Sequence, residues 1–209
     1  MAWRVLMRRC PSRSMTVVGD LAQTGSRAGA GSWQDVLGPY VAQRWHLEEL
    51  TINYRNPAEI AELADNVLAA IDVDITPPQS VRRSGVAPRA VRVGSLADEL
   101  PAVVAEEATA VGDGRLAVLA PAAGVDELRT ILGSSESGAD DLDAPVTVLT
   151  VHQAKGLEFD AVVLVDPAAI VAESPRGLND LYVALTRSTQ RLCIVHPGDL
   201  PPVLAPNLA

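Results

Sequence analysis

Two apolar, β-branched runs constrain the fold of this 209-residue chain more than any other feature of its sequence. The first, residues 147–151, leads into a polar loop that carries His152, Lys155 and Glu158, and the second, residues 161–165, follows directly. Short apolar runs of this kind are typical of strands buried within a sheet. Because open parallel α/β sheets bind ligands outside the carboxyl ends of their strands, we expect this loop to contact a ligand.

Strand-like and helix-like segments alternate along most of the chain. This alternation predicts a mostly parallel α/β domain of the RecA type, the P-loop NTPase fold, with flanking helices. Further strands are expected at residues 15–18, 47–52, 91–93, 116–119 and 191–195. Helices are expected to begin at Trp33 and at Ser174–Pro175, and to cover residues 97–111 and 125–132.

The segment after Asn56 has the strongest helix-start signal in the sequence. Asn56 is a good cap, Pro57 suits the first helical position, and Glu59 stands where a capping box needs a carboxylate. Apolar residues then recur at helical spacing, which predicts one buried face. They are Ile60, Leu63, Ala64, Val67, Leu68 and Ile71.

Composition limits the compartment and the partners. No apolar run approaches the roughly 18 residues that cross a bilayer, and the basic N-terminus lacks the apolar core of a signal peptide. Two isolated cysteines, Cys10 and Cys193, form no disulfide or metal pattern, so we expect a cytoplasmic protein. The net charge of −9 disfavours tight binding to nucleic acid by the chain alone, although a local basic groove is compatible with it.

Four polar clusters follow strands or lie near helix ends. Each could bind a ligand, but each could also have a purely structural role. Gly19–Asp20–Leu21–Ala22–Gln23 could be no more than a capped turn, and Asn53–Tyr54–Arg55 no more than surface. In the long polar loop, His152 could be a hydrogen-bonded residue that shapes the loop, and Lys155, the only lysine, could reflect codon bias. In the segment 181–187, Arg187 lies opposite the Leu178/Leu181/Leu185 stripe on a helical wheel, so it could be a solvated arginine.

In order and spacing, the four clusters resemble motifs of the UvrD/Rep class of superfamily 1 helicase-like ATPases, over about residues 15–196. The resemblance implies catalytic roles for three residues: Gln23 would sense the γ-phosphate and the attacking water, Arg55 would reach the γ-phosphate, and Arg187 would act as an arginine finger. It also implies that Tyr54 stacks on the base, that Glu158 binds the ribose and that Gly156 permits close backbone approach. Thr150 and His152 match positions that touch single-stranded nucleic acid in true helicases.

The phosphate-binding loop G-x-x-x-x-G-K-[ST] and the acidic strand that holds magnesium are both missing from the sequence. In the family both lie upstream. Residues 1–46 therefore resemble the end of a first RecA-like domain and residues 47–209 a second one. ATP and Mg²⁺ are the implied cofactors, the upstream domain is the implied partner, and none of the residues here is expected to bind the metal. The chain alone is expected to be inactive as an ATPase.

Two departures from unwinding helicases bear on the branch. Residues 121–145 are too few to hold the large extra domain of those enzymes, and residues 24–33 lack their aromatic stretch that stacks on bases. Both departures resemble the HelD branch, whose members act on bacterial RNA polymerase, which makes RNA polymerase the expected partner. A DNA-repair helicase, with DNA as partner, and a non-catalytic RecA-like binding module are the alternatives.

Overall fold

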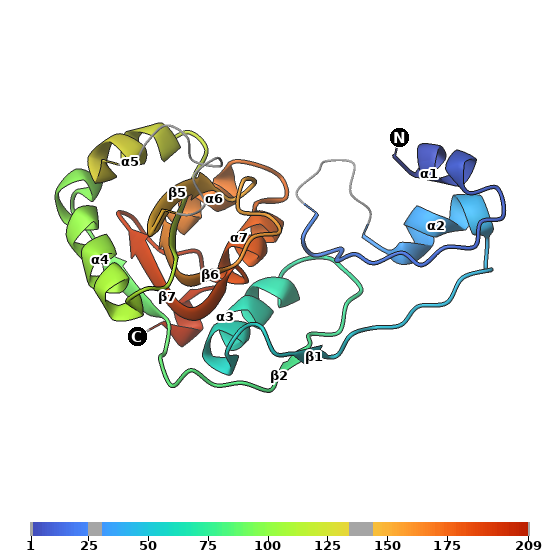
Figure 1. Ribbon diagram of the computed structural model, residues 1–209, viewed down its shortest axis with the longest axis horizontal. Coiled ribbons are helices and arrows are strands. Elements are labelled where there is room, and N and C mark those ends of the chain that lie inside the picture. Colours follow the sequence, from blue (N-terminus) through green and yellow to red (C-terminus); the bar gives the residue numbers. More distant parts are fainter. Residues whose placement is uncertain (1, 25–30, 134–143, 209) are drawn as a thin grey trace.

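The computed structural model of the protein describes residues 2–24, 31–133 and 144–208. Figure 1 shows two parts. A layered α/β part contains the sheet, and an N-terminal part carries α1 (Ala2–Arg9) and α2 (Trp33–Val41). Ser32 caps α2, because its Oγ accepts a hydrogen bond from the backbone nitrogen of Asp35 at 3.1 Å. The helix expected to begin at Trp33 is thus confirmed.

Five parallel strands form the central sheet, in the order β3-β7-β6-β4-β5. Their bounds are Arg89–Arg92 for β3, Ser188–His196 for β7, Phe159–Val165 for β6, Leu116–Ala120 for β4 and Val146–Thr150 for β5. Successive side chains of a strand point to opposite faces. In β4, Ala117 and Leu119 face one core cluster, whereas Leu116 and Val118 face another. Burial on both faces explains why β4 is continuously apolar and β6 nearly so, and the five parallel strands confirm the predicted parallel α/β class.

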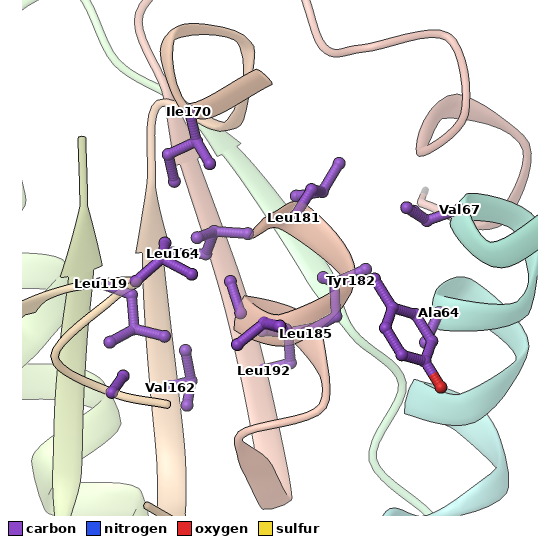
Figure 2. Packing of buried hydrophobic residues seen from close by; sticks show 14 of the residues in the cluster. Ala64, Val67, Leu119, Val162, Leu164, Ile170, Leu181, Tyr182, Leu185 and Leu192 are labelled. Carbon is purple, nitrogen blue, oxygen red and sulfur yellow. The ribbon is translucent and has the colours of Figure 1, made fainter. Parts of the chain in front are cut away.

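Helices cover both faces of the sheet (Figure 1). One face carries α4 (Leu96–Val111) and α5 (Val125–Leu132), and the other carries α3 (Ala58–Ala69), α6 (Pro167–Ala172) and α7 (Gly177–Leu185). Figure 2 shows Leu181 and Leu185 of α7 packed toward the strands, with Tyr182 turned toward α3. Short strands β1 (Ile52–Asn53) and β2 (Gln79–Ser80) pair beside α3, and a 3₁₀ turn (Ala205–Asn207) lies near the carboxyl end. No helix within the described ranges is both long and apolar enough to traverse a lipid bilayer.

Two of the expected strands are wrong or shortened. Residues 15–18 form no strand, and Val18 is 87% exposed. The segment predicted at 47–52 reduces to β1, and Leu50 ahead of it is 84% exposed. An apolar run becomes a strand only where a neighbour pairs with its backbone. Among the described residues, only β2 pairs with the second segment, and no strand pairs with the first.

The predicted starts of two helices also need correction. The N-cap of α3 is Pro57, whose side chain has no polar atom that could cap the helix, and the side chain of Asn56 is bonded elsewhere. Glu59 does not close a capping box but accepts hydrogen bonds from the backbone nitrogens of Ser84 and Gly85 at 3.2 and 3.1 Å. The helix expected at Ser174 begins later, as α7 at Gly177. The buried face predicted for α3 is confirmed from Ile60 to Leu68, whereas Ile71 lies beyond the end of the helix and is half-buried.

Gly177 lies where α7 begins close against α6, and its replacement is expected to destabilise the fold. An alanine Cβ there would lie 2.0 Å from the carbonyl oxygen of Val171, so the backbone of one helix would have to move. We expect Gly177→Ala to lower the free energy of unfolding by about 1–3 kcal/mol, the usual range for overpacking, as measured by urea denaturation. Gly198→Ala is the matched control, because nothing lies within 4 Å of its added Cβ. Equal unfolding midpoints for the two variants would contradict this packing argument.

Candidate functional site

The loop between β5 and β6, residues 151–158, runs from the carboxyl ends of the strands back to their amino ends. These two sides of the sheet are called its carboxyl edge and its amino edge below. Both strands run parallel to β4, so Thr150 ends β5 at the carboxyl edge while Phe159 begins β6 at the amino edge. The seven residues of β6 separate these edges by roughly 20 Å. The expectation that the loop lies at the carboxyl edge therefore holds for Thr150 and His152. It is wrong for Glu158, because the loop has by then reached the amino edge.

Three candidate residues meet at the amino edge. Phe159 of β6 pairs with Ser188 of β7, so Glu158 and Arg187 directly precede two adjacent strands. Arg55 joins them from the segment between β1 and α3, where its Nε lies 2.8 Å from Oε1 of Glu158. Both side chains of this ion pair are 45% exposed. Tyr54, beside Arg55, is 74% exposed, so its ring is accessible to a planar ligand.

Arg187 is buried rather than solvated, with 1% of its surface exposed. Helix α7 ends at Leu185, so the helical-wheel position inferred for Arg187 was wrong. Its Nε donates to the carbonyl of Val183 at 3.0 Å, and Nη1 donates to the carbonyl of Leu157 at 3.2 Å. Its Nη2 faces Oε1 of Gln23 at 3.4 Å. The guanidinium is therefore held in one orientation by three separate segments of the chain.

Electrostatics at this edge favour an anionic ligand. Burial lowers the pKa of Arg187, the positive charge of Arg55 lowers it further, and Glu158 acts in the opposite direction. Two guanidinium groups thus influence one another, and the nearby carboxylate of Glu158 is already paired with Arg55. An anion near the arginines would relieve their repulsion and could accept charge-assisted hydrogen bonds from the half-exposed Arg55.

Gln23 reaches the site from the N-terminal part of the chain. Its Nε2 donates to Oδ2 of Asp20 at 2.9 Å, and its backbone carbonyl accepts a hydrogen bond from Nζ of Lys155 at 2.6 Å. Asn179 Nδ2 donates to the neighbouring carbonyl of Ala22 at 2.8 Å. Ala22 is fully buried in the core cluster that contains α3 and α7. Lys155 therefore has a specific structural contact, and sequence reasoning had not singled out Asn179.

Gly156 adopts a φ of +85°, in the left-handed region that favours glycine. Space is not the reason for glycine, because an added Cβ would meet nothing within 4 Å. Gly156, Glu158 and Arg115 line a hollow of about 240 Å³ together with Leu157 and Phe159. Of the Arg55–Glu158 pair, Glu158 lines this hollow.

Thr150 and His152 do not join this cluster. The backbone nitrogen and Oγ1 of Thr150 both donate to Oε1 of Gln153, at 2.9 and 3.1 Å, which closes the turn after β5. His152 is exposed, and its side chain makes no hydrogen bond to the described residues. Gln153, rather than His152, therefore shapes the start of the loop. Across the described ranges, no three His, Cys, Asp or Glu side chains gather closely enough to hold a metal ion.

Known proteins resemble this chain in sequence and in fold. Residues 145–195 match the UvrD-like helicase C-terminal domain. The chain resembles the C-terminal domain of a possible DNA helicase from Lactobacillus plantarum WCFS1, with 22% identity and a TM-score of 0.54, over 73% of this chain and 92% of that one. A structure of the PRRSV helicase is 16% identical with a TM-score of 0.48, over 92% of this chain and 32% of that one.

None of the curated proteins compared with the chain matches it. The structural likeness confirms the predicted RecA-like fold, since the relative from Lactobacillus plantarum shares the architecture over most of its length. The sequence match covers β5, the crossing loop, β6, α6, α7 and most of β7, which include Glu158 and Arg187. Residues 145–195 thus match the UvrD-like helicase C-terminal domain in sequence, and the chain around them has the fold of the helicase C-terminal domain from Lactobacillus plantarum.

Proposed function

We propose that the chain is the C-terminal motor half of an ATP-dependent superfamily 1 helicase-like protein and completes an ATP site formed with an upstream RecA-like domain. One observation carries this proposal. Gln23, Arg55, Glu158 and Arg187 are spread over 165 positions of the sequence, yet they lie at one edge of the sheet, where Arg55 contacts Glu158 at 2.8 Å and Arg187 contacts Gln23 at 3.4 Å. Residues 1–46 would end the first domain, and residues 47–209 would form the second.

Each side chain has chemistry that suits a nucleoside triphosphate. The exposed ring of Tyr54 can stack on the base, and Glu158 can accept hydrogen bonds from the ribose. Arg55 presents a planar fork that can bind phosphate oxygens in pairs. Arg187 has the same fork but is 1% exposed and bonded through Nε, Nη1 and Nη2, so it would have to be uncovered to reach a phosphate. Gln23 can both donate to and accept from a water beside the γ-phosphate. Arg55 and Glu158 must part to serve these roles. Exposed ion pairs contribute only about 0–1 kcal/mol, so a ligand can displace this one at little cost.

Magnesium ligands and the phosphate-binding loop would come from the upstream domain. The 209 residues contain no G-x-x-x-x-G-K-[ST] sequence, and the described part of the chain has no cluster of three metal-binding side chains. We therefore expect the 209-residue chain alone to show no magnesium-dependent ATP hydrolysis in a phosphate-release assay. Turnover by the purified chain, unaffected by Arg187→Ala, would refute both this expectation and the proposed division of the site.

The partner we propose is bacterial RNA polymerase, in the cytoplasm, as in the HelD branch. The β4–β5 connection supports this choice because its described part contains one helix, α5, of 8 residues. Residues 134–143 of the same connection lie outside the described residues. The acidic net charge of −9 suits a partner that itself binds nucleic acid. Residues 25–30, within the stretch that lacks stacking aromatics, also lie outside the described residues.

ATP hydrolysis by the full-length parent, measured with RNA polymerase and with single-stranded DNA in parallel, tests this partner. We expect polymerase to stimulate turnover and DNA to have little effect. Stimulation by DNA alone would assign the parent to the DNA-repair helicases, with Thr150 and His152 at the carboxyl edge as the first residues to test for DNA contact.

A further inference from the structure

Asn56 connects two parts of the proposed ATP site that lie far apart in the sequence. Its Nδ2 donates to the carbonyl of Thr186 at 3.1 Å and to the carbonyl of Ser188 at 2.7 Å, across 130 and 132 residues. These two carbonyls stand on either side of Arg187 in the chain. Asn56 is 4% exposed, so both hydrogens of its amide are committed to these bonds.

The other atoms of Asn56 are fixed to the segment that carries Tyr54 and Arg55. Asn53 Oδ1 accepts from the backbone nitrogens of Arg55 and Asn56 at 3.0 and 3.1 Å, which forms a tight turn around Tyr54. Asn53 Nδ2 donates to Asn56 Oδ1 at 3.4 Å, and Ser80 Oγ donates to the Asn56 carbonyl at 2.7 Å. Every polar group of Asn56 therefore has a partner, and its side chain has no freedom to turn.

We infer that Asn56 is a positioning residue, which holds the backbone of Arg187 in a fixed relation to Arg55 so that both arginines reach the same phosphate group. The inference rests on the proposed function above. Its basis is that one side chain bonds both neighbours of Arg187 while its own backbone follows Arg55 directly. An asparagine just before a helix usually caps it with its side chain. Asn56 does not do so, since α3 has no side-chain cap. Only a side chain with two donors on one atom can make both bonds.

Steady-state ATP hydrolysis by the full-length parent tests this role with two variants. Asn56→Ala removes the amide, and Asn56→Asp keeps its shape but cannot donate to either carbonyl. We expect both to lower kcat by about 10- to 100-fold, as small misplacements of catalytic groups do, with KM for ATP changed far less. In an Arg187→Ala background, Asn56→Ala should cause no further loss, because its effect acts through Arg187. An additive loss would overturn the inference.

Asn66→Ala is the matched control. Asn66 is half-buried on α3, and its Nδ2 has no hydrogen-bond partner among the described residues, so kcat should be unchanged. Thermal melting of every variant shows whether it is folded at the assay temperature. If both Asn56 variants fail to fold, Asn56 serves stability alone and the inference is wrong. If Arg187→Ala abolishes turnover while the Asn56 variants retain kcat, only this inference fails. If Arg187→Ala leaves turnover intact, the proposed function fails as well.

Discussion

Arg187→Ala in the full-length parent is expected to lower ATP turnover by about 10³- to 10⁵-fold, as the loss of an arginine finger does in related phosphoryl transfer. The physical reason is positional. The guanidinium is held in one direction by the carbonyls of Val183 and Leu157 and faces Gln23, so once it is uncovered in the complete site its charge is already aimed at one place on a transferred phosphoryl group. Steady-state kcat and the affinity for a fluorescent ATP analogue are the measurements. ATP binding should be largely retained, because the upstream phosphate loop remains.

Two further variants separate catalysis from folding at this position. Arg187→Lys keeps the charge but loses the planar fork, so we expect it to remain strongly impaired. Arg92→Ala, at a side chain that is 67% exposed at the end of β3, should leave turnover unchanged. Retention of more than about a tenth of the rate in a folded Arg187→Ala variant would exclude the arginine-finger role. Unchanged function of the parent after replacement of Arg55 and Arg187 together would instead support a non-catalytic binding module.

Glu107→Ala is expected to lower the free energy of unfolding by about 3 kcal/mol, the low end of the range for breaking a buried ion pair. Glu107 lies on α4 with its side chain 2% exposed, and its oxygens bind Nε of Arg89 at 2.9 Å and Nε of Arg191 at 2.8 Å. These arginines belong to β3 and β7. Removal of the carboxylate would leave two guanidiniums facing one another without their shared counter-charge.

The neighbouring glutamate provides a close control. Glu106 lies on the same helix and binds the same Arg89, through Nη2 at 2.8 Å, but its side chain is 63% exposed. We expect Glu106→Ala to cost less than about 1 kcal/mol, as exposed ion pairs do. Urea denaturation of the 209-residue chain measures both variants. Similar losses for Glu106→Ala and Glu107→Ala would show that burial does not govern this cluster.

The sheet could be predicted from sequence because its strands carry their own signal. β4, β5 and β6 carry apolar residues on both faces. The observed bounds of α4 and α5 agree with the predicted ones to within one residue. Residues 15–18 carry a similar apolar signal, yet Val18 is 87% exposed. The difference lies in backbone pairing with a distant strand, which local composition does not encode.

The candidate site was predictable in its residue types but not in its geometry. Gln23, Arg55, Glu158 and Arg187 were identified from their motifs, and the structure brings them together. The burial of Arg187 was missed because α7 ends two residues before it, so the helical wheel no longer applied. The role of Asn56 was hidden for a similar reason, since its partners lie 130 and 132 residues away.

Because the β5–β6 loop crosses the sheet, we expect it to tolerate less change in length than the β4–β5 connection does. Eight residues, 151–158, must cover the depth of the sheet, and turn hydrogen bonds from Ala154 to Thr150 and from Leu157 to Ala154 already shorten their reach. A loop two residues shorter could span at most about 20 Å when fully extended, which leaves no length for those turns. Deletions here should therefore break the sheet, whereas the β4–β5 connection can gain residues without such a limit. We therefore expect inserted domains in related chains to lie in the β4–β5 connection and not in the β5–β6 loop.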